Sequence, residues 1–130
     1  MTKYVALDRL KPNSWFLNRK KLDIVRQIWR DGNQHLLHAI LVTTIDNELS
    51  LLDGHCRAFV AWENGAVDIL ADIESLHLIS GPKDLYIVFH RQAPTIGIHH
   101  VADLGKRIYN LAETSDPDVM ALITEAHLTK

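Results

Sequence analysis

The feature that most constrains the fold is a junction at which a short apolar run passes through a single glycine, Gly54, into a helical pattern. Residues 48–52 have the composition of a strand, and residues 53–55 follow without a linker. Residues 56–64 then place apolar side chains at helical spacing, and Gly65 is suited to end that helix. A strand and a helix therefore meet here with almost no loop between them.

Further strands and helices can be placed around this junction. Residues 38–44 form a second apolar run, joined to the first across Asp46 and Asn47, a pair that favours a hairpin. Asn18 is a suitable N-cap residue for a helix. The remaining elements are a strand at 4–7, turn-forming residues at 11–14, a helix at 19–30 and a strand at 67–73. The order strand, helix, two strands, helix, strand predicts an α/β (α+β) fold, a small mixed sheet with helices packed on it.

The last third of the chain is expected to be helical. Pro82 and Pro117 are suited to first helical positions. Helices are predicted at residues 83–92, 101–111 and 117–128. The chain has 130 residues, which is the size of one domain. We therefore expect a single domain with a core at residues 1–74 and a C-terminal helical extension at residues 75–130.

Charge is unevenly distributed along the sequence. The formal net charge is −2, but residues 1–30 carry eight basic and two acidic residues, and the remainder is net acidic. The first helix and the segment before it contain a basic set: Lys11, Arg19, Lys20, Arg26 and Arg30. This face is an ordinary solvated surface, or it borders the Gly54 turn and attracts anionic ligands. A third reading is that the same face binds nucleic acid nonspecifically.

Several classes of protein are not expected. No apolar run approaches the roughly 20 residues that span a bilayer, and the first residues lack the apolar core of a signal peptide. A single cysteine, Cys56, agrees with a reducing compartment. The eight histidines include His35, His38, His99 and His100, but no HExxH pattern or set of cysteines accompanies them. The sequence predicts a cytoplasmic protein with no metal site and no membrane partner.

The junction is also the segment that can carry chemistry. A glycine turn into a helix leaves the first N–H groups of that helix free to hold an anion, and Gly54 permits its close approach. Arg57 would add a charged fork that fits phosphate oxygens. His55 could transfer a proton near neutral pH, and Asp53 could hold a metal-bound water or orient His55. Residues 53–57 therefore form a candidate phosphate-binding turn.

Plainer roles for the same residues stay open. Asp53 could cap the helix, and Arg57 could be an exposed helix residue. Cys56 lies three and four residues before Phe59 and Val60, which places it on the inner stripe of the helix. We therefore expect Cys56 to be a small buried side chain, and we assign it no catalytic role.

The segment L-L-D-G-H-C-R-A-F-V-A-W-x-x-G-A-x-x-I, with the order of elements around it, resembles the ParB/sulfiredoxin superfamily over about residues 4–74. Members of that superfamily carry a G-x-x-R turn at this junction. The D-G-H-x-R version is most similar to stand-alone ParB-like proteins and free serine kinases, which hold nucleotide phosphates there, and the similar turn of partition proteins contributes to CTP binding. The resemblance implicates Gly54, His55 and Arg57, with Asp53 as a companion. It implies a nucleotide such as ATP, ADP or CTP, with Mg²⁺, as the ligand.

The sequence departs from each branch of the superfamily. Sulfiredoxins carry a cysteine directly after the glycine, whereas here Cys56 is one position later, so sulfinate reduction is not expected. The kinases rely on a glutamate from the first part of the chain, but the earliest glutamate here is Glu48. Partition proteins continue into a helix-turn-helix, for which the segment after Glu74 has no convincing pattern. Sequence-specific DNA binding is therefore not expected.

Two functions remain after these departures. The first is binding of a nucleotide or another phosphorylated ligand at residues 53–57. If the ligand is turned over, phosphoryl transfer or hydrolysis is the expected reaction, with His55 as the catalytic proton shuttle. The second is a catalytically silent protein-interaction or oligomerisation module that retains the fold and meets a partner, or a second copy, through its acidic C-terminal helices.

Overall fold

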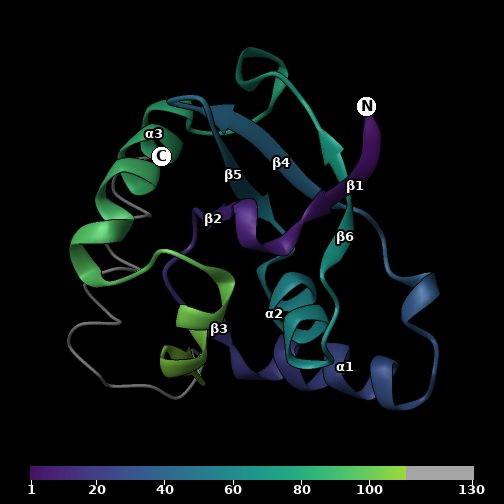
Figure 1. The fold of residues 1–130 in the computed structure, drawn as a ribbon. Coiled ribbons are helices and arrows are strands. Elements are labelled where there is room, and N and C mark those ends of the chain that lie inside the picture. Colours follow the sequence, from purple (N-terminus) through teal and green to yellow (C-terminus); the bar gives the residue numbers. More distant parts are fainter. Residues whose placement is uncertain (111–130) are drawn as a thin grey trace.

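A five-stranded sheet forms the centre of the protein, and helices pack against it (Figure 1). The computed structural model describes residues 1–110. The strands are β1 (Thr2–Ala6), β2 (Leu10–Pro12), β3 (Leu17–Asn18), β4 (Ile40–Ile45), β5 (Glu48–Asp53), β6 (Asp68–Ile73) and β7 (Ile108–Tyr109). The α-helices are α1 (Arg19–Arg30), α2 (His55–Glu63) and α3 (Lys83–Gln92). Short 3₁₀ helices are η1 (Leu7–Arg9), η2 (Gln34–Leu36), η3 (Leu76–Leu78), η4 (Ala93–Ile96) and η5 (Val101–Lys106).

The sheet is mixed, as predicted. Its strand order is β1-β6-β4-β5-β2. The β1–β6 and β4–β5 pairs are antiparallel, whereas β4–β6 and β2–β5 are parallel. β4 and β5 form the expected hairpin, in which Asp46 (φ 53°) and Asn47 (φ 62°) both adopt the left-handed conformation that a tight two-residue turn requires. The predicted α+β class, a mixed sheet with packed helices, is therefore confirmed.

The two helices near the junction form successive layers over the sheet. Small α2 side chains, Ala58 and Ala61, pack on apolar sheet residues such as Val42. On the other side of α2, Phe59 and Val60 share a second cluster with residues of α1. Small residues let α2 lie close to the sheet, and the larger ones fill the space between the helices. This layering fixes the first turn of α2 at the end of β5.

The first helix begins where the sequence places it. The Asn18 side chain accepts a hydrogen bond of 3.0 Å from the Lys20 N–H and caps α1. Leu22 and Val25 are the buried residues of α1, as its apolar stripe predicts. The helix ends at Arg30, before Gly32, whose φ is 73°. The apolar stripe of α1 therefore packs in the cluster that also holds Phe59 and Val60 of α2.

Two predicted segments differ in the structure. Residues 11–14 were expected to form a turn, but residues up to Pro12 belong to β2, the edge strand beside β5. An edge position tolerates proline, which has no N–H to donate to the ladder. The helix expected at 101–111 is the 3₁₀ helix η5 followed by β7, which pairs in parallel with β3. Glycine disfavours an α-helix, and a Cβ at Gly105 would lie 3.2 Å from the Phe59 ring.

Residues from the expected extension contribute to the same core as residues 1–74. Leu104 is fully buried, and Ala93 and Ile98 lie in the cluster that also holds Leu17 and Leu22. The predicted helix at 83–92 is observed as α3. The helix expected at 117–128 lies outside the described residues. Up to residue 110, the chain after β6 therefore adds buried side chains to the cluster formed by α1 and α2.

Replacing Leu104 by alanine tests this shared core. We expect the free energy of unfolding to fall by about 2–5 kcal/mol, because the substitution opens a cavity at a fully buried site. Chemical denaturation measures the change. Ile96→Ala is the control from the same segment, since Ile96 is 38% exposed and its truncation should cost about 1 kcal/mol or less. Equal, small losses in both variants would contradict the shared core.

Candidate functional site

Gly54 is the residue that turns the chain from β5 into α2. It is the N-cap of α2, and its φ of 98° lies in a region that residues with a side chain rarely adopt. A Cβ built at this position would lie 2.6 Å from Ile40 Cγ2 and 2.9 Å from Arg57 Nη2. Glycine is therefore required here both by the backbone conformation and by the close approach of β4 and the Arg57 side chain.

The N-terminus of α2 has no side-chain cap. The first helical hydrogen bond runs from the Ala58 N–H to the Gly54 carbonyl, so the N–H groups of the preceding turn have no acceptor within the helix. Asp53 does not cap α2, which corrects the plainer reading of that residue. Its side chain is 77% exposed and lies 3.4 Å from Arg57 Nη2. The turn is therefore open to an external acceptor.

Arg57 is folded back over the turn and is largely buried. Its Nη1 donates to the carbonyl oxygens of His38 (2.7 Å) and Ala39 (3.0 Å), and its Nη2 lies beside Asp53. The guanidinium thus joins the start of α2 to the segment that precedes β4. Only 18% of the side chain is exposed, so Arg57 is not an ordinary surface residue of the helix. Its charge still lies at the turn, where it favours an anion.

His55 is buried beneath the turn and acts as a hydrogen-bond acceptor. Its Nε2 accepts from the backbone N–H groups of Asn13 (3.1 Å) and Ser14 (2.9 Å). Burial lowers the pKa of His55 from 6.5 to about 4, an effect that the neighbouring Asp53 charge and a backbone hydrogen bond with Leu51 only partly oppose. The ring is therefore neutral at pH 7. These contacts give His55 a positioning role, and its predicted role as a proton shuttle stays a prediction.

A cleft of about 500 Å³ opens beside the turn. Asp53, Gly54 and Arg57 line one part of it, together with Lys21 of α1. Apolar side chains line much of the remainder: Phe16, Leu17, Ile24, Val25, Ile28 and Leu37. The structure therefore brings all four predicted site residues, Asp53, Gly54, His55 and Arg57, into the lining of one cavity.

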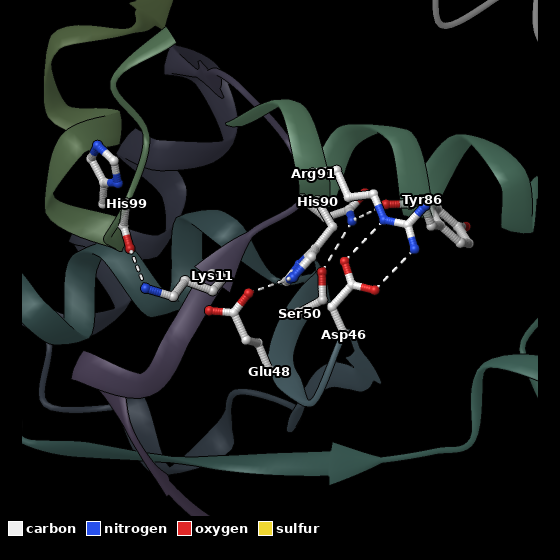
Figure 2. Close-up of polar contacts among 9 residues, drawn as sticks. Lys11, Asp46, Glu48, Ser50, Tyr86, His90, Arg91 and His99 are labelled. Carbon is white, nitrogen blue, oxygen red and sulfur yellow. Dashed lines mark hydrogen bonds and ion pairs between the residues drawn. The ribbon is translucent and has the colours of Figure 1, made fainter. Parts of the chain in front are cut away.

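The basic residues singled out in the sequence do not line this cleft. Arg26 pairs with Glu63 at 2.7 Å, and Lys11 donates to the His99 carbonyl at 3.4 Å (Figure 2). The cation of α1 that does line the cleft is Lys21, which the sequence analysis did not single out. Its position one residue before the buried Leu22 was the available signal, because it places Lys21 beside the inner stripe of the helix.

The sequence predicts a small buried side chain at Cys56, whereas the structure leaves it half-buried in the lining of the cleft. Its side chain is partly buried against the second cluster, and burial raises the pKa of its thiol above the ordinary value. Nearby Lys21 and a hydrogen bond from the Asn18 backbone act in the opposite direction but do not cancel this effect. Burial therefore disfavours the thiolate of Cys56, which is the nucleophilic form of a cysteine.

Glu48 lies away from the cleft lining and has another partner. Figure 2 shows Glu48 Oε1 beside His90 Nε2 of α3, at 3.1 Å, and the adjacent ion pair between Asp46 and Arg91. Both contacts attach the β4–β5 hairpin to α3. Glu48 is absent from the residues that line the cleft. Its contacts therefore explain the packing of the hairpin rather than chemistry at the turn.

The histidine groups noted in the sequence, for which no metal site is expected, have separate surroundings. His100 Nε2 lies 2.9 Å from Asp8, and its Nδ1 accepts from the Ala102 N–H at the start of η5. His35 and His38 line a second cavity of about 320 Å³, behind Leu37 and Arg57. Within residues 1–110, no group of three or more His, Cys, Asp or Glu side chains is placed to hold a metal ion.

Comparisons with known proteins agree with this architecture. No family model matches the chain, and no curated protein matches its sequence. Among solved structures, protein Atu1540 from Agrobacterium tumefaciens superposes with a TM-score of 0.60 at 18% identity, over 93% of this chain and 69% of that one. The fold is ParB/sulfiredoxin-like. Sulfiredoxin from Arabidopsis thaliana is also matched, with a TM-score of 0.48 at 17% identity, over 58% of this chain and 85% of that one.

Atu1540 shares its arrangement of strands and helices with this chain, which is evidence about the fold. The superfamily resemblance given by the motif is thus confirmed at the level of the fold, and at that level only. None of the helices described up to residue 110 has the length and apolar character needed to cross a bilayer. What the turn binds has to be argued from its own geometry.

The buried His55 predicts a pH-dependent stability. An unfolded histidine binds a proton below about pH 6.5, whereas folded His55 does so only below about pH 4. The unfolded state thus takes up more protons between these values, so stability is complete above pH 6.5 and falls by about 3 kcal/mol as the pH drops to 4. Denaturation of the wild type and of His55→Gln across this range measures the effect, and the variant should lose most of the slope.

His35→Gln is the matched control for this pH experiment. His35 is exposed, so its removal should leave the pH dependence of unfolding close to that of the wild type. A wild-type stability that does not change between pH 6.5 and 4, or a slope that survives in His55→Gln, would contradict the buried, neutral His55.

Replacing Gly54 by alanine tests whether the close approach of Ile40 and Arg57 requires a glycine at this position. Gly54→Ala should destabilise by about 1–2 kcal/mol for the left-handed backbone alone, and by more because of the Ile40 contact. Gly65→Ala is the control, since Gly65 also has a positive φ, 82°, but its Cβ would meet nothing within 4 Å. Thermal unfolding of both variants gives the difference. Equal losses would show that close packing at Gly54 does not matter.

Proposed function

We propose that this protein binds a phosphorylated small molecule in the cleft beside residues 53–57, with the phosphate at the first turn of α2. One observation carries the proposal. The uncapped N-terminus of α2 opens at a glycine that excludes any side chain, and the cleft that it borders is also lined by two cations, Lys21 and Arg57. Unpaired N–H groups, the helix dipole and two positive charges all favour an anion there.

Each residue of the turn has a distinct part in this proposal. Gly54 permits the left-handed turn into α2 and the close approach of Arg57, and Lys21 supplies the exposed positive charge. Arg57 holds the turn in place through hydrogen bonds to the His38 and Ala39 carbonyls. Its positive charge also lies at the turn and favours an anion there. His55, as a neutral acceptor, holds the Asn13–Ser14 backbone at the edge of the same cleft. The site is therefore assembled before the ligand arrives.

A nucleotide with Mg²⁺, the ligand that the superfamily resemblance implies, can be fitted to these residues. Mg²⁺ is commonly bound through one or two carboxylates together with substrate phosphates, and Asp53 presents an exposed carboxylate at the cleft. The ion would neutralise phosphate charge. Asp53 is also the carboxylate of the lining that could act as a base if the ligand is turned over, because Glu48 is paired with His90. We propose binding as the function and a cytoplasmic location.

Lys21 and its neighbour give a matched test. The purified protein should gain about 4–8 °C in Tm with at least one of ATP, ADP or CTP, with magnesium, at about tenfold its Kd. Lys21→Ala should lose most of this gain because it removes the exposed cation of the cleft. Lys20→Ala should keep it, since Lys20 is also exposed on the same helix but does not line the cleft. Differential scanning fluorimetry measures all three proteins.

The outcome of this test separates the proposal from its alternatives. No shift with any nucleotide, nor with simpler phosphate esters, would contradict phosphate binding. Equal loss in both lysine variants would instead indicate nonspecific attraction by the basic helix. A protein that binds none of these ligands, and that light scattering shows to be a stable oligomer, would favour the alternative function as a protein-interaction or oligomerisation module.

A further inference from the structure

The apolar part of the cleft constrains the body of the ligand, once the phosphate is placed at the turn. Polar groups gather at the end formed by residues 53–57 and Lys21. The larger share of the lining is hydrocarbon from α1, from the segment before it and from the segment before β4. A ligand that fills this cavity must therefore carry its charge at one end and place the rest of its surface against apolar side chains.

Ile24 is the clearest sign of this constraint. It lines the cleft and is 57% exposed, whereas Leu22 and Val25 of the same helix are buried. Ile28 lies one turn further along α1 and also lines the cleft, so the two isoleucines form a row on the helix surface. Single exposed apolar residues are common, but a row inside a cavity leaves apolar surface that a ligand can remove from water.

Leu37, in the segment that precedes β4, adds a third aliphatic side chain to this apolar wall. It lines the cleft and packs, partly buried, against the second cluster. The carbonyls of the next two residues, His38 and Ala39, accept the hydrogen bonds from Arg57. The guanidinium that lies at the polar end of the cleft therefore also fixes the chain beside its apolar wall. Both ends of the cavity are held in one arrangement.

Each of the neutral polar side chains Ser14, Asn18 and His55 already uses one of its polar atoms in a hydrogen bond within the protein. Ser14 Oγ donates to the Phe16 carbonyl at 3.3 Å, and Asn18 Oδ1 accepts from the Lys20 N–H. His55 Nε2 accepts from two backbone N–H groups. A ligand body with many hydroxyl groups would lose hydrogen bonds to water and find few replacements here. The apolar wall of the cleft therefore discriminates against a polyhydroxylated ligand body.

We propose that the ligand of this cleft is a phosphate monoester with a mainly hydrocarbon body, which lies along Ile24 and Ile28 while the phosphate meets Lys21 and the Gly54 turn. This inference rests on the proposed phosphate binding and makes it more specific. It ranks an alkyl or other apolar phosphate above a nucleotide, because the ribose hydroxyls of a nucleotide would face the same apolar wall. No covalent step is involved.

A series of phosphate esters tests this proposal directly. Methyl, butyl and hexyl phosphate and AMP are titrated into the ¹⁵N-labelled full chain, and Kd values are taken from the shifts of the backbone amides of residues 54–57. Burial of each added methylene should tighten binding by about threefold to fourfold. Hexyl phosphate has five more methylenes than methyl phosphate and should therefore bind about 200-fold more tightly or better when all five are buried, and more tightly than AMP.

Two variants link the gain to the apolar wall. In Ile24→Gln, the ratio of the Kd of methyl phosphate to the Kd of hexyl phosphate should fall by at least about threefold. The reason is that a polar amide replaces exposed hydrocarbon of similar size. Glutamine is a good helix former, so α1 should be retained. Leu36→Gln is the matched control. Leu36 is 69% exposed and does not line the cleft, and this variant should keep the full gain.

The failure of this inference can be told apart from the failure of phosphate binding. Esters that bind with no dependence on chain length, or AMP that binds more tightly than hexyl phosphate, would overturn the hydrocarbon body and leave phosphate binding intact. If 1-hexanol binds as tightly as hexyl phosphate, or if no ester moves the amides of residues 54–57, the phosphate site itself is wrong. An equal effect of both glutamine variants would also overturn the placement along Ile24.

Discussion

The architecture around the junction depends on one guanidinium. Arg57, from the first turn of α2, donates to two successive carbonyls at 2.7 and 3.0 Å and lies against Gly54. These bonds connect the end of β5, the start of α2 and the approach to β4 in one arrangement. Charged hydrogen bonds are among the stronger polar contacts in proteins, and removal of the guanidinium would take this partner from both carbonyls. The same contact brings a polar turn and an apolar wall to a single cavity.

The sequence predicts the parts of this fold that depend on local chemistry. Asn18 caps its helix, Asp46 and Asn47 form the hairpin turn, and Gly54 marks the change from strand to helix, because side-chain size and hydrogen bonding decide each of these features locally. The short strands were missed for the opposite reason. Residues 10–12 have little strand character of their own, and they pair only because β5 lies beside them.

The candidate site was predicted as a set of residues but not as a set of roles. Sequence motifs name Asp53, His55 and Arg57, yet they do not show which polar atoms face solvent and which satisfy the backbone. Folding buries His55 under two N–H groups and directs Arg57 to two carbonyls. Lys21 enters the site through the packing of α1 on α2, which brings together residues more than 30 positions apart. The proximity of Lys21 to the turn depends on tertiary packing, so no local sequence pattern predicts it.

The parallel pairing of β3 with β7 has a consequence for how the chain folds. Leu17 pairs with Ile108, about 90 residues later, and the Leu17 N–H also donates to the Arg107 carbonyl. The beginning of α1 is thus anchored to a segment synthesised long after it. Contacts of such high sequence separation slow folding, because a long loop must close before they can form. During translation, the wall of the cleft built by α1 would stay incomplete until about residue 110 has left the ribosome, so the cleft is a late product of folding.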